Sequence, residues 1–468
     1  MSYRFEEINI TADAPFANCK LGRQRYAEIL GQILSNGSDG YVMSLNGSWG
    51  TGKSTFVKMW QQMLKNEGYT TLYFNAWEHD YISDPLVGLI GELSKVCSKE
   101  NTKKLLDTIK TIAGKLFLRI VPTIGKHVVK HYLGEGVADA VSEALSEGAD
   151  IFKSEIDKYQ EESESLQAFR KSLKEFAESC DEEHPLVFFV DELDRCNPTF
   201  AVKVLERIKH LFAVPHVVFV LSIDKEQLAN SIRGFYGSDR IDADEYLRRF
   251  IDVEYFLPKP DYDSFINYVC DTLELDALIG KNCDKVFRSH QECVKTLIVR
   301  LLAEKNLTLR QIEKILIHTK LVLLSQQSNK NQCPEVLIML LYFRFFEHDL
   351  YLKIKKRDLD IQQLADAVEK ALGQNVFGKK GKYDSAIPTF ITFALAELYK
   401  FYSIDNNGCQ VHELTIKDKD NNDKLAFRTK LSQELLLKDF DDIYPAIRIL
   451  QDIFERIDLL HELSYGQQ

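Results

Sequence analysis

The chain has 468 residues, of which 45% are hydrophobic and 28% are charged, and its formal net charge is −11 at pH 7. This composition is ordinary for globular protein, and the length allows a large core divided over about three domains. The acidic balance argues against a protein whose whole surface coats nucleic acid, although it leaves room for local basic patches.

The cysteine pattern and the apolar segments are both compatible with a cytoplasmic location. The nine cysteines include no Cys-x-x-Cys pair, which suits reduced thiols better than a disulfide framework or a zinc site. The N-terminus lacks a basic segment followed by an apolar one. No stretch without acidic or basic residues reaches the ~20 residues of a membrane helix. We therefore expect a cytoplasmic protein without a transmembrane segment.

The first informative feature in chain order is a glycine-rich loop between a predicted strand and a predicted helix. Residues 41–45 form an apolar, β-prone run, and residues 58–64 have helical spacing. Between them, residues 47–54 (GSWGTGKS) fit the nucleotide-phosphate loop pattern Gly-x-x-x-x-Gly-Lys-Ser/Thr at every fixed position. A strand, a glycine-rich turn and a helix N-terminus together make an anion site, so both flanks argue against a chance match.

This phosphate loop predicts binding of ATP with Mg²⁺. Its glycines let several backbone N–H groups point at one phosphate, Lys53 supplies a cation for the β- and γ-phosphates, and Ser54 can ligate Mg²⁺. The candidate nucleotide-binding residues of the loop are Gly47, Trp49, Gly50, Thr51, Gly52, Lys53, Ser54 and Thr55.

A long helix-prone insertion, at residues 95–180, follows a second predicted strand at residues 70–77. Within the insertion, residues 111–133 are apolar enough to lie on a surface or a partner but too charged to cross a bilayer. Residues 137–145 have the pattern of an amphipathic helix. Residues 155–183 are strongly acidic, and we expect them to form a solvated helical arm.

A second set of candidate site residues follows the insertion. Residues 186–190 are an apolar run that predicts a buried parallel strand, and the strand ends in Asp191 and Glu192. Open α/β sheets bind ligands at the C-terminal ends of their strands. Asp191 would hold Mg²⁺, and Glu192 would act as the general base toward the attacking water. Alternatively, the two acids only cap the next helix, a reading weakened by the complete phosphate loop upstream.

The rest of the chain predicts two further strands and then only helices. A helix is expected at residues 200–211, strands at residues 216–224 and 251–257, and a domain end at Pro258 and Pro260. The helical periodicities beyond them lie at residues 265–275, 294–302, 309–324, 359–372 and 388–402, with polar loops at residues 373–384 and 404–424.

The predicted fold class is therefore α/β: a P-loop NTPase parallel sheet with a helical insertion, followed by an all-α C-terminal domain. The first domain would cover residues 1–260, and residues 261–468 would form a helical lid and C-terminal domain.

These motifs together resemble the KAP family of P-loop NTPases over residues 15–325. Residues 74–80 (FNAWEHD) are similar to the Phe-x-x-Trp signature of the family, and residues 190–198 (VDELDRCNP) to its extended Asp-strand motif. Residues 246–250 (YLRRF) followed by Pro258, and the long insertion, complete the likeness. The resemblance implies a sheet with an extra strand between the phosphate-loop strand and the Asp-Glu strand. Many members carry apolar spans in the insertion, so this chain looks like a soluble branch.

The resemblance also implies roles for several polar residues. Arg23 would sit near the adenine or ribose, Asp224 would sense the γ-phosphate, and Arg310 would be the lid arginine that senses nucleotide. Each has a structural alternative: a surface arginine, a helix cap and a helix-surface arginine. Trp77 is expected to be a core anchor.

Three further arginines could act on the transition state. Arg248 and Arg249 precede the last strand, where a positioned cation can neutralise the charge of the transferred phosphoryl group; the alternative is an ordinary basic helix end. Arg195 could reach a neighbouring subunit's nucleotide or pair with Asp194.

These observations favour Mg²⁺-dependent ATP hydrolysis driving an oligomeric molecular switch. A homo-oligomer is expected, an unidentified protein partner is compatible with it, and binding of nucleic acid stays open. The resemblance to bacterial members implies a role in defence, either anti-phage defence by phage exclusion or plasmid-linked defence. One alternative is a nucleic-acid-remodelling ATPase, favoured by the basic run at residues 352–357 and disfavoured by the acidic balance. The other is a P-loop kinase, weakened by Glu192 and by the lack of a recognisable acceptor pocket.

Overall fold

The computed structural model of the chain divides into two compact units, one of Glu6–Pro260 and one of Asp261–Gln468 with Met1–Phe5. We describe each unit by itself. The residues that the structure describes are 8–35, 39–96, 100–120, 155–280, 295, 297–302, 305, 307–325, 334–359, 363–364, 366–368, 370–372, 398, 451 and 453–458.

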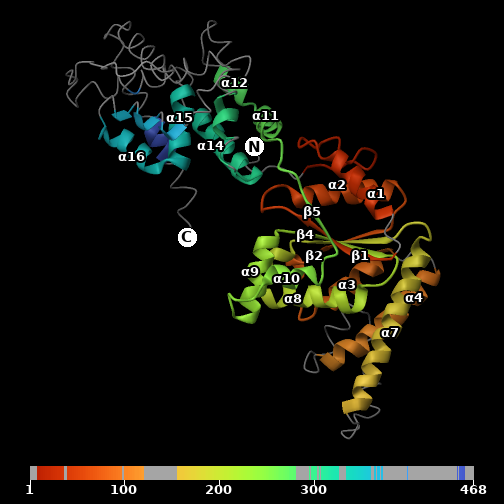
Figure 1. Ribbon diagram of the computed structural model, residues 1–468. Coiled ribbons are helices and arrows are strands. Elements are labelled where there is room, and N and C mark those ends of the chain that lie inside the picture. Colours follow the sequence, from red (N-terminus) through yellow and green to blue (C-terminus); the bar gives the residue numbers. More distant parts are fainter. Residues whose placement is uncertain are drawn as a thin grey trace, which may run out of the picture. The chain divides into compact units, whose positions relative to one another are not determined.

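The first unit is built on a five-stranded parallel sheet with the strand order β2-β3-β4-β1-β5 (Figure 1). The strands are β1 Tyr41–Asn46, β2 Thr71–Asn75, β3 Leu186–Asp191, β4 Val217–Ile223 and β5 Val253–Phe256. Every residue of β3 and β4 is buried, because helices cover both faces of a parallel sheet. Strand β4 separates β1 from β3, so the predicted extra strand between the phosphate-loop strand and the Asp-Glu strand is confirmed.

The register of the sheet aligns the ends of four strands. Asn75 at the end of β2 lies opposite Asp191, and Asp191 lies opposite Ser222 of β4. Ser222 in turn lies opposite Leu45, one residue before the end of β1. The residues that follow β1, β2, β3 and β4 therefore emerge at one edge of the sheet, which is where a parallel sheet binds ligands.

Two layers of helices cover the sheet. Figure 1 shows α1 (Gln24–Ser35) and α2 (Lys53–Asn66) on one face. The helices on the opposite face are α3 Pro85–Leu93, α8 Pro198–Arg207, α9 Lys225–Tyr236 and α10 Ala243–Arg248. Neighbouring residues of β3 supply both cores, because successive side chains point to opposite faces. Phe189 packs against Trp60 of α2 at 5.3 Å between ring centroids, whereas Phe188 stacks on Phe219 at 5.0 Å in the other core.

The described part of the insertion is a pair of helices that pack side by side, α4 (Glu100–Ile120) and α7 (Glu155–Cys180) (Figure 1). The expectation that residues 155–183 form a solvated arm is wrong for the second half of α7. Phe169, Leu173 and Phe176 recur at helical spacing, and all three are fully buried in the same core as β3. The predicted helix at residues 137–145 lies outside the described residues.

Several element ends differ from the predictions, and for two of them the contacts give the reason. Strand β2 ends at Asn75 and not at residue 77, because the Asn75 side chain accepts the backbone N–H groups of Trp77 (3.1 Å) and Glu78 (3.3 Å) and starts the 3₁₀ turn Trp77–His79. Helix α8 begins early, at Pro198, because Asn197 caps it. No helix in the described part of the chain is long and apolar enough to cross a membrane.

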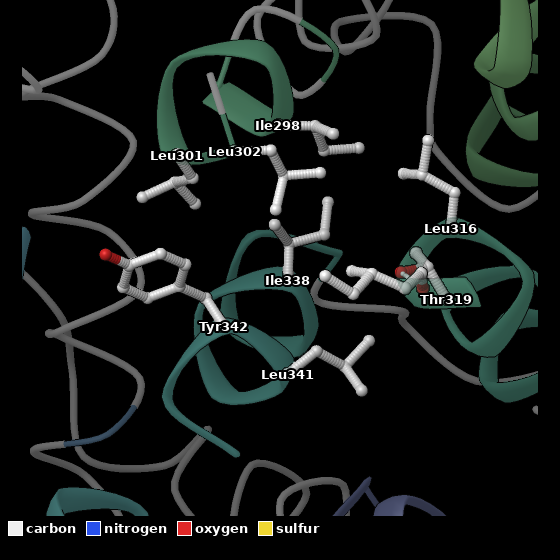
Figure 2. Close-up of a pocket in the computed structure, with 9 residues that line it drawn as sticks. Ile298, Leu301, Leu302, Leu316, Thr319, Ile338, Leu341 and Tyr342 are labelled. Atoms are coloured by element: carbon white, nitrogen blue, oxygen red, sulfur yellow. Dashed lines mark hydrogen bonds between the residues drawn. The ribbon is translucent and has the colours of Figure 1, made fainter. Parts of the chain in front are cut away.

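The described elements of the second unit are helices, namely α11 Tyr262–Thr272, α12 Leu275–Gly280, α14 Leu309–Ser325, α15 Pro334–Phe346 and α16 His348–Lys356. Figure 2 shows where residues 298–302, α14 and α15 meet around a small cavity of about 20 Å³. Its lining is aliphatic apart from Thr319 and Tyr342, and the Thr319 hydroxyl donates to the Ile315 carbonyl of its own helix at 2.9 Å. We regard the cavity as a packing gap of the helical core. The predicted helix at residues 388–402 and both predicted polar loops lie almost wholly outside the described residues.

We predict that Asp84→Ala strongly destabilises the first unit. The Asp84 carboxylate, which is 1% exposed, caps α3 through the Leu86 N–H and binds Arg207 of α8 through two hydrogen bonds of 3.1 and 2.6 Å. Removing one partner of a buried pair leaves the other charge uncompensated, so we expect a loss of about 3 kcal/mol. The measurement is the urea midpoint of the full chain followed by circular dichroism.

The matched control is Lys171→Ala on the exposed side of α7, where the lysine only meets Glu175 at 4.0 Å. An exposed pair of this kind contributes less than about 1 kcal/mol. Equal midpoints for the two variants would contradict the assignment of the Asp84–Arg207 pair as the link between α3 and α8.

Candidate nucleotide-binding site

The phosphate loop joins β1 to α2 at the edge of the sheet where the strand ends align. Gly50 and Gly52 have φ angles of 73° and 81°, a left-handed conformation that favours glycine. Gly52 is also the N-cap residue of α2. The first N–H groups of α2 have no partner in their own helix, which makes this helix end suitable for a phosphate group. Ser54 and Thr55 lie half-buried in the first turn of α2.

Lys53 lies within the loop and is 8% exposed. Its Nζ atom donates hydrogen bonds to the carbonyls of Gly47 at 2.5 Å and Ser48 at 3.2 Å. Burial lowers the pKa of Lys53, and the negative charges of nearby acids, Asp194 first and then Asp224 and Asp191, act in the opposite direction. The ammonium group is therefore surrounded by oxygen atoms that a bound phosphate group could replace as hydrogen-bond acceptors.

Asp191 is held in a fixed orientation at the end of β3. One carboxylate oxygen accepts the Tyr73 hydroxyl at 2.9 Å, and the other accepts the Glu192 N–H at 3.0 Å. Burial, followed by the charge of Asp191, raises the pKa of Tyr73, so the phenol stays a hydrogen-bond donor at neutral pH. Asp191 itself is 1% exposed.

The oxygen donors of Asp191 and Ser54 suit Mg²⁺. This ion usually keeps several waters and takes one or two protein oxygens together with the phosphates of its substrate. Among the described residues there is no group of three or more His, Cys, Asp or Glu that could hold a metal without a substrate.

Glu192 has an unusual backbone conformation and two side-chain partners. Its φ and ψ of 58° and 25° are left-handed, which is uncommon for a residue other than glycine, and it begins the 3₁₀ turn Leu193–Arg195. Its Oε1 atom pairs with Arg195 at 2.9 Å, and its Oε2 atom accepts Nδ2 of Asn75 at 3.3 Å. The predicted general base thus already binds two hydrogen-bond donors.

Two predictions about the neighbours of Glu192 are wrong. The ion pair of Arg195 is with Glu192 and not with Asp194, because the Leu193–Arg195 turn brings residues three apart together. Trp77 is not a core anchor, since half of the side chain (50%) is exposed. Instead the Arg195 guanidinium lies over the Trp77 ring, 5.5 Å from its centroid.

Asp194 joins the Asp-strand turn to the phosphate loop. Its carboxylate, in a residue that is 5% exposed, accepts the indole N–H of Trp49. Burial raises the pKa of Asp194, and the positive charge of Lys53 opposes that rise. Sequence reasoning missed this contact. The available signal was an acidic residue one turn after Asp191 within the VDELDRCNP motif.

Asp224 both caps a helix and contacts the phosphate loop. One carboxylate oxygen accepts the Gln227 N–H at 3.4 Å at the start of α9, and the other accepts the backbone N–H of Trp49 at 3.2 Å. The helix-cap alternative for Asp224 is therefore confirmed. Its role toward the γ-phosphate stays a prediction.

Arg23 is 2% exposed, so it is not a surface arginine. Its two Nη atoms donate to the carbonyl of Gly52 and to the carbonyl of Pro258, each at 3.3 Å. Arg23 thus links the end of the phosphate loop to the segment after β5. Its predicted contact with the adenine or ribose stays a prediction.

The remaining predicted arginines are all exposed. Arg248 is exposed at the end of α10 and pairs with Glu245 at 3.2 Å, and the neighbouring Arg249 is also exposed. Arg310 is exposed in the first turn of α14, which belongs to the second unit. The roles of these three arginines stay predictions.

A model of the KAP family P-loop domain matches residues 23–322 of the chain. No curated protein matches it. Several solved structures are similar to the chain. One is a replication initiator DnaA bound to AMPPCP and single-stranded DNA, at 12% identity and a TM-score of 0.31 over 98% of this chain and 99% of that one. Others are a DNA replication initiation factor (12% identity, TM-score 0.29, 95% of this chain and 94% of that one) and the Aeropyrum pernix ORC2 protein in ADPNP–ADP complexes (13% identity, TM-score 0.31, 89% of this chain and 95% of that one).

The family match covers more than half of the chain and includes the phosphate loop, the Trp77 segment and the strand that ends in Asp191. The same residues form a parallel sheet in which β4 separates β1 from β3. The motif resemblance is thereby confirmed, and the chain belongs to the KAP family of P-loop NTPases.

Proposed function

We propose that this protein hydrolyses ATP in the presence of Mg²⁺. The observation that supports this best is the position of Lys53: it lies within a complete phosphate loop, buried, with the charges of Asp191, Asp194 and Asp224 acting on it. A buried lysine among loop carbonyls and strand-end acids is the arrangement that phosphoryl transfer needs, since this chemistry is mostly positioning and charge neutralisation.

Each part of the site has one role in the proposed reaction. The N–H groups of the loop and Lys53 bind the β- and γ-phosphates, and Ser54 and Asp191 hold the Mg²⁺ ion that neutralises their charge. Glu192 accepts the proton of the attacking water or orients that water. Arg23 stabilises the conformation of the loop by donating a hydrogen bond to the Gly52 carbonyl.

The proposal extends to an oligomeric switch in which a neighbouring subunit completes the site. Arg248 and Arg249 are the better candidates for the residue supplied in trans, because they are exposed, whereas Arg195 is bound to Glu192 of its own chain. A role in anti-phage defence is supported by the family resemblance alone. Loss of protection in cells that carry an inactive phosphate-loop variant would be its test.

We predict that Lys53→Ala abolishes phosphate release from ATP while the protein stays folded, because Lys53 binds loop carbonyls and is not part of the apolar core. The control is Lys65→Ala, an exposed lysine in the last turn of the same helix, which should hydrolyse ATP normally. Phosphate release is measured with ATP and Mg²⁺ alone, without DNA or an acceptor, so that a remodelling enzyme and a kinase are distinguished from a switch. Unchanged release in Lys53→Ala would contradict the site assignment.

We predict that Glu192→Gln binds ATP but turns it over at least about 100-fold more slowly, because glutamine keeps the shape of the side chain and one acceptor oxygen but cannot accept a proton. Binding is measured with a fluorescent ATP analogue and turnover by phosphate release. Glu182→Gln, exposed just before the other end of β3, serves as the control. Turnover near the wild-type rate would mean that another residue orients the water.

We predict that the specific activity rises with protein concentration and that Arg248→Ala or Arg249→Ala binds ATP without hydrolysing it. A trans arginine is worth ~10³-fold or more in rate, so hydrolysis would depend on assembly. Mixing the inactive arginine variant with Lys53→Ala should restore part of the activity, since each subunit then supplies what the other lacks. A strictly monomeric species with concentration-independent activity would rule out the trans mechanism.

A further inference from the structure

Glu192, the proposed base, is engaged at both carboxylate oxygens by residues of its own chain. Arg195 binds Oε1 at 2.9 Å and Asn75 binds Oε2 at 3.3 Å, and the Glu192 side chain is only 17% exposed. Each carboxylate oxygen that could accept a hydrogen bond from the attacking water therefore already accepts one from a donor of its own chain. In this arrangement the base is restrained before any substrate reaches it.

Arg195 is in turn held in place by Trp77, a residue outside the Leu193–Arg195 turn. The Arg195 guanidinium lies over the ring of Trp77, 5.5 Å from the centroid, and the Trp77 side chain is 50% exposed. A tryptophan ring attracts a guanidinium placed over its face. Asn75 holds the start of this segment, because its Oδ1 accepts the N–H of Trp77 at 3.1 Å while its Nδ2 reaches Glu192.

We propose that Arg195 is a positioning residue that restrains Glu192, and that Trp77 keeps Arg195 in place. The exposed ring at the end of β2 then limits the basal rate of the site at the end of β3. This inference rests on the proposed function, because it concerns the base of that same reaction. It gives the Phe-x-x-Trp segment a role in hydrolysis, as the support of the arginine that binds the proposed base.

The kinetic test compares kcat and KM for ATP in Trp77→Ala, Trp77→Phe and Arg195→Ala. Loss of a cation–π contact at an exposed site corresponds to about a two- to fivefold change in rate, so we expect kcat of Trp77→Ala to rise by that factor with KM unchanged. Arg195→Ala should rise at least as much. Trp77→Phe keeps a ring face under the guanidinium and should stay near the wild-type rate.

The matched control is Tyr81→Ala, an aromatic residue of the same segment that is 72% exposed, and its kcat should not change. A second arm repeats Trp77→Ala in the Glu192→Gln background, where the rise should disappear because the effect passes through the Glu192 carboxylate. A fall or no change in kcat of Arg195→Ala would overturn the restraint. A rise that persists in the Glu192→Gln background would also overturn it.

A readout without hydrolysis separates this inference from the proposed function. Arg195 covers one face of Trp77, so Arg195→Ala should increase quenching of tryptophan fluorescence by acrylamide, whereas the same substitution in a Trp77→Phe background should have no effect. Equal quenching with and without Arg195 would overturn the inference. Absence of ATP hydrolysis in the wild type and in all variants, with the quenching difference present, would instead overturn the proposed function.

Discussion

The alignment of strand ends across the parallel sheet is the constraint on which the whole site depends. Because Asn75, Asp191, Ser222 and Leu45 occupy one row of the register, the turns that follow four different strands meet at one edge. A slip of one residue in any of these pairings would turn alternate side chains to the other face of the sheet. The two separate cores fed by Phe188 and Phe189 make such a slip costly, since each ring would then face the wrong helix layer.

The five residues from Asp191 to Arg195 place the acidic side chains of the site against β2 and the phosphate loop. Asp191 faces the hydroxyl of Tyr73, Glu192 faces Asn75, and Asp194 accepts the indole N–H of Trp49 in the phosphate loop. The left-handed backbone at Glu192 separates these directions over a very short stretch of chain. Strain of this kind persists only where the surroundings determine it, and here partners from β2 and from the phosphate loop lie on either side.

The elements of the sheet and the phosphate loop could be predicted from sequence, because each depends on a local pattern: an apolar run for β3 and β4, and fixed glycine spacing for residues 47–54. The contacts of Trp77 and Arg195 could not. From sequence, a tryptophan such as Trp77 is expected to be buried in the core. Only the fold shows that the guanidinium of Arg195, from a segment distant in the sequence, lies over its ring. The burial of the second half of α7 was not predicted because the helix is strongly acidic overall. The three side chains that face the core, Phe169, Leu173 and Phe176, are few among its charged residues.

The charges of the site also indicate how a nucleotide would have to bind. Three carboxylates, those of Asp191, Asp194 and Asp224, act on the single ammonium group of Lys53. A triphosphate entering this edge would meet net negative charge unless a cation accompanies it. The raised pKa of Asp194 has a different cause, because it is burial that disfavours the charged form, while the positive charge of Lys53 opposes the rise. Binding of the nucleotide and of a divalent cation should therefore be strongly linked at this site, and the carboxylates that repel ATP alone would then favour ATP that carries Mg²⁺.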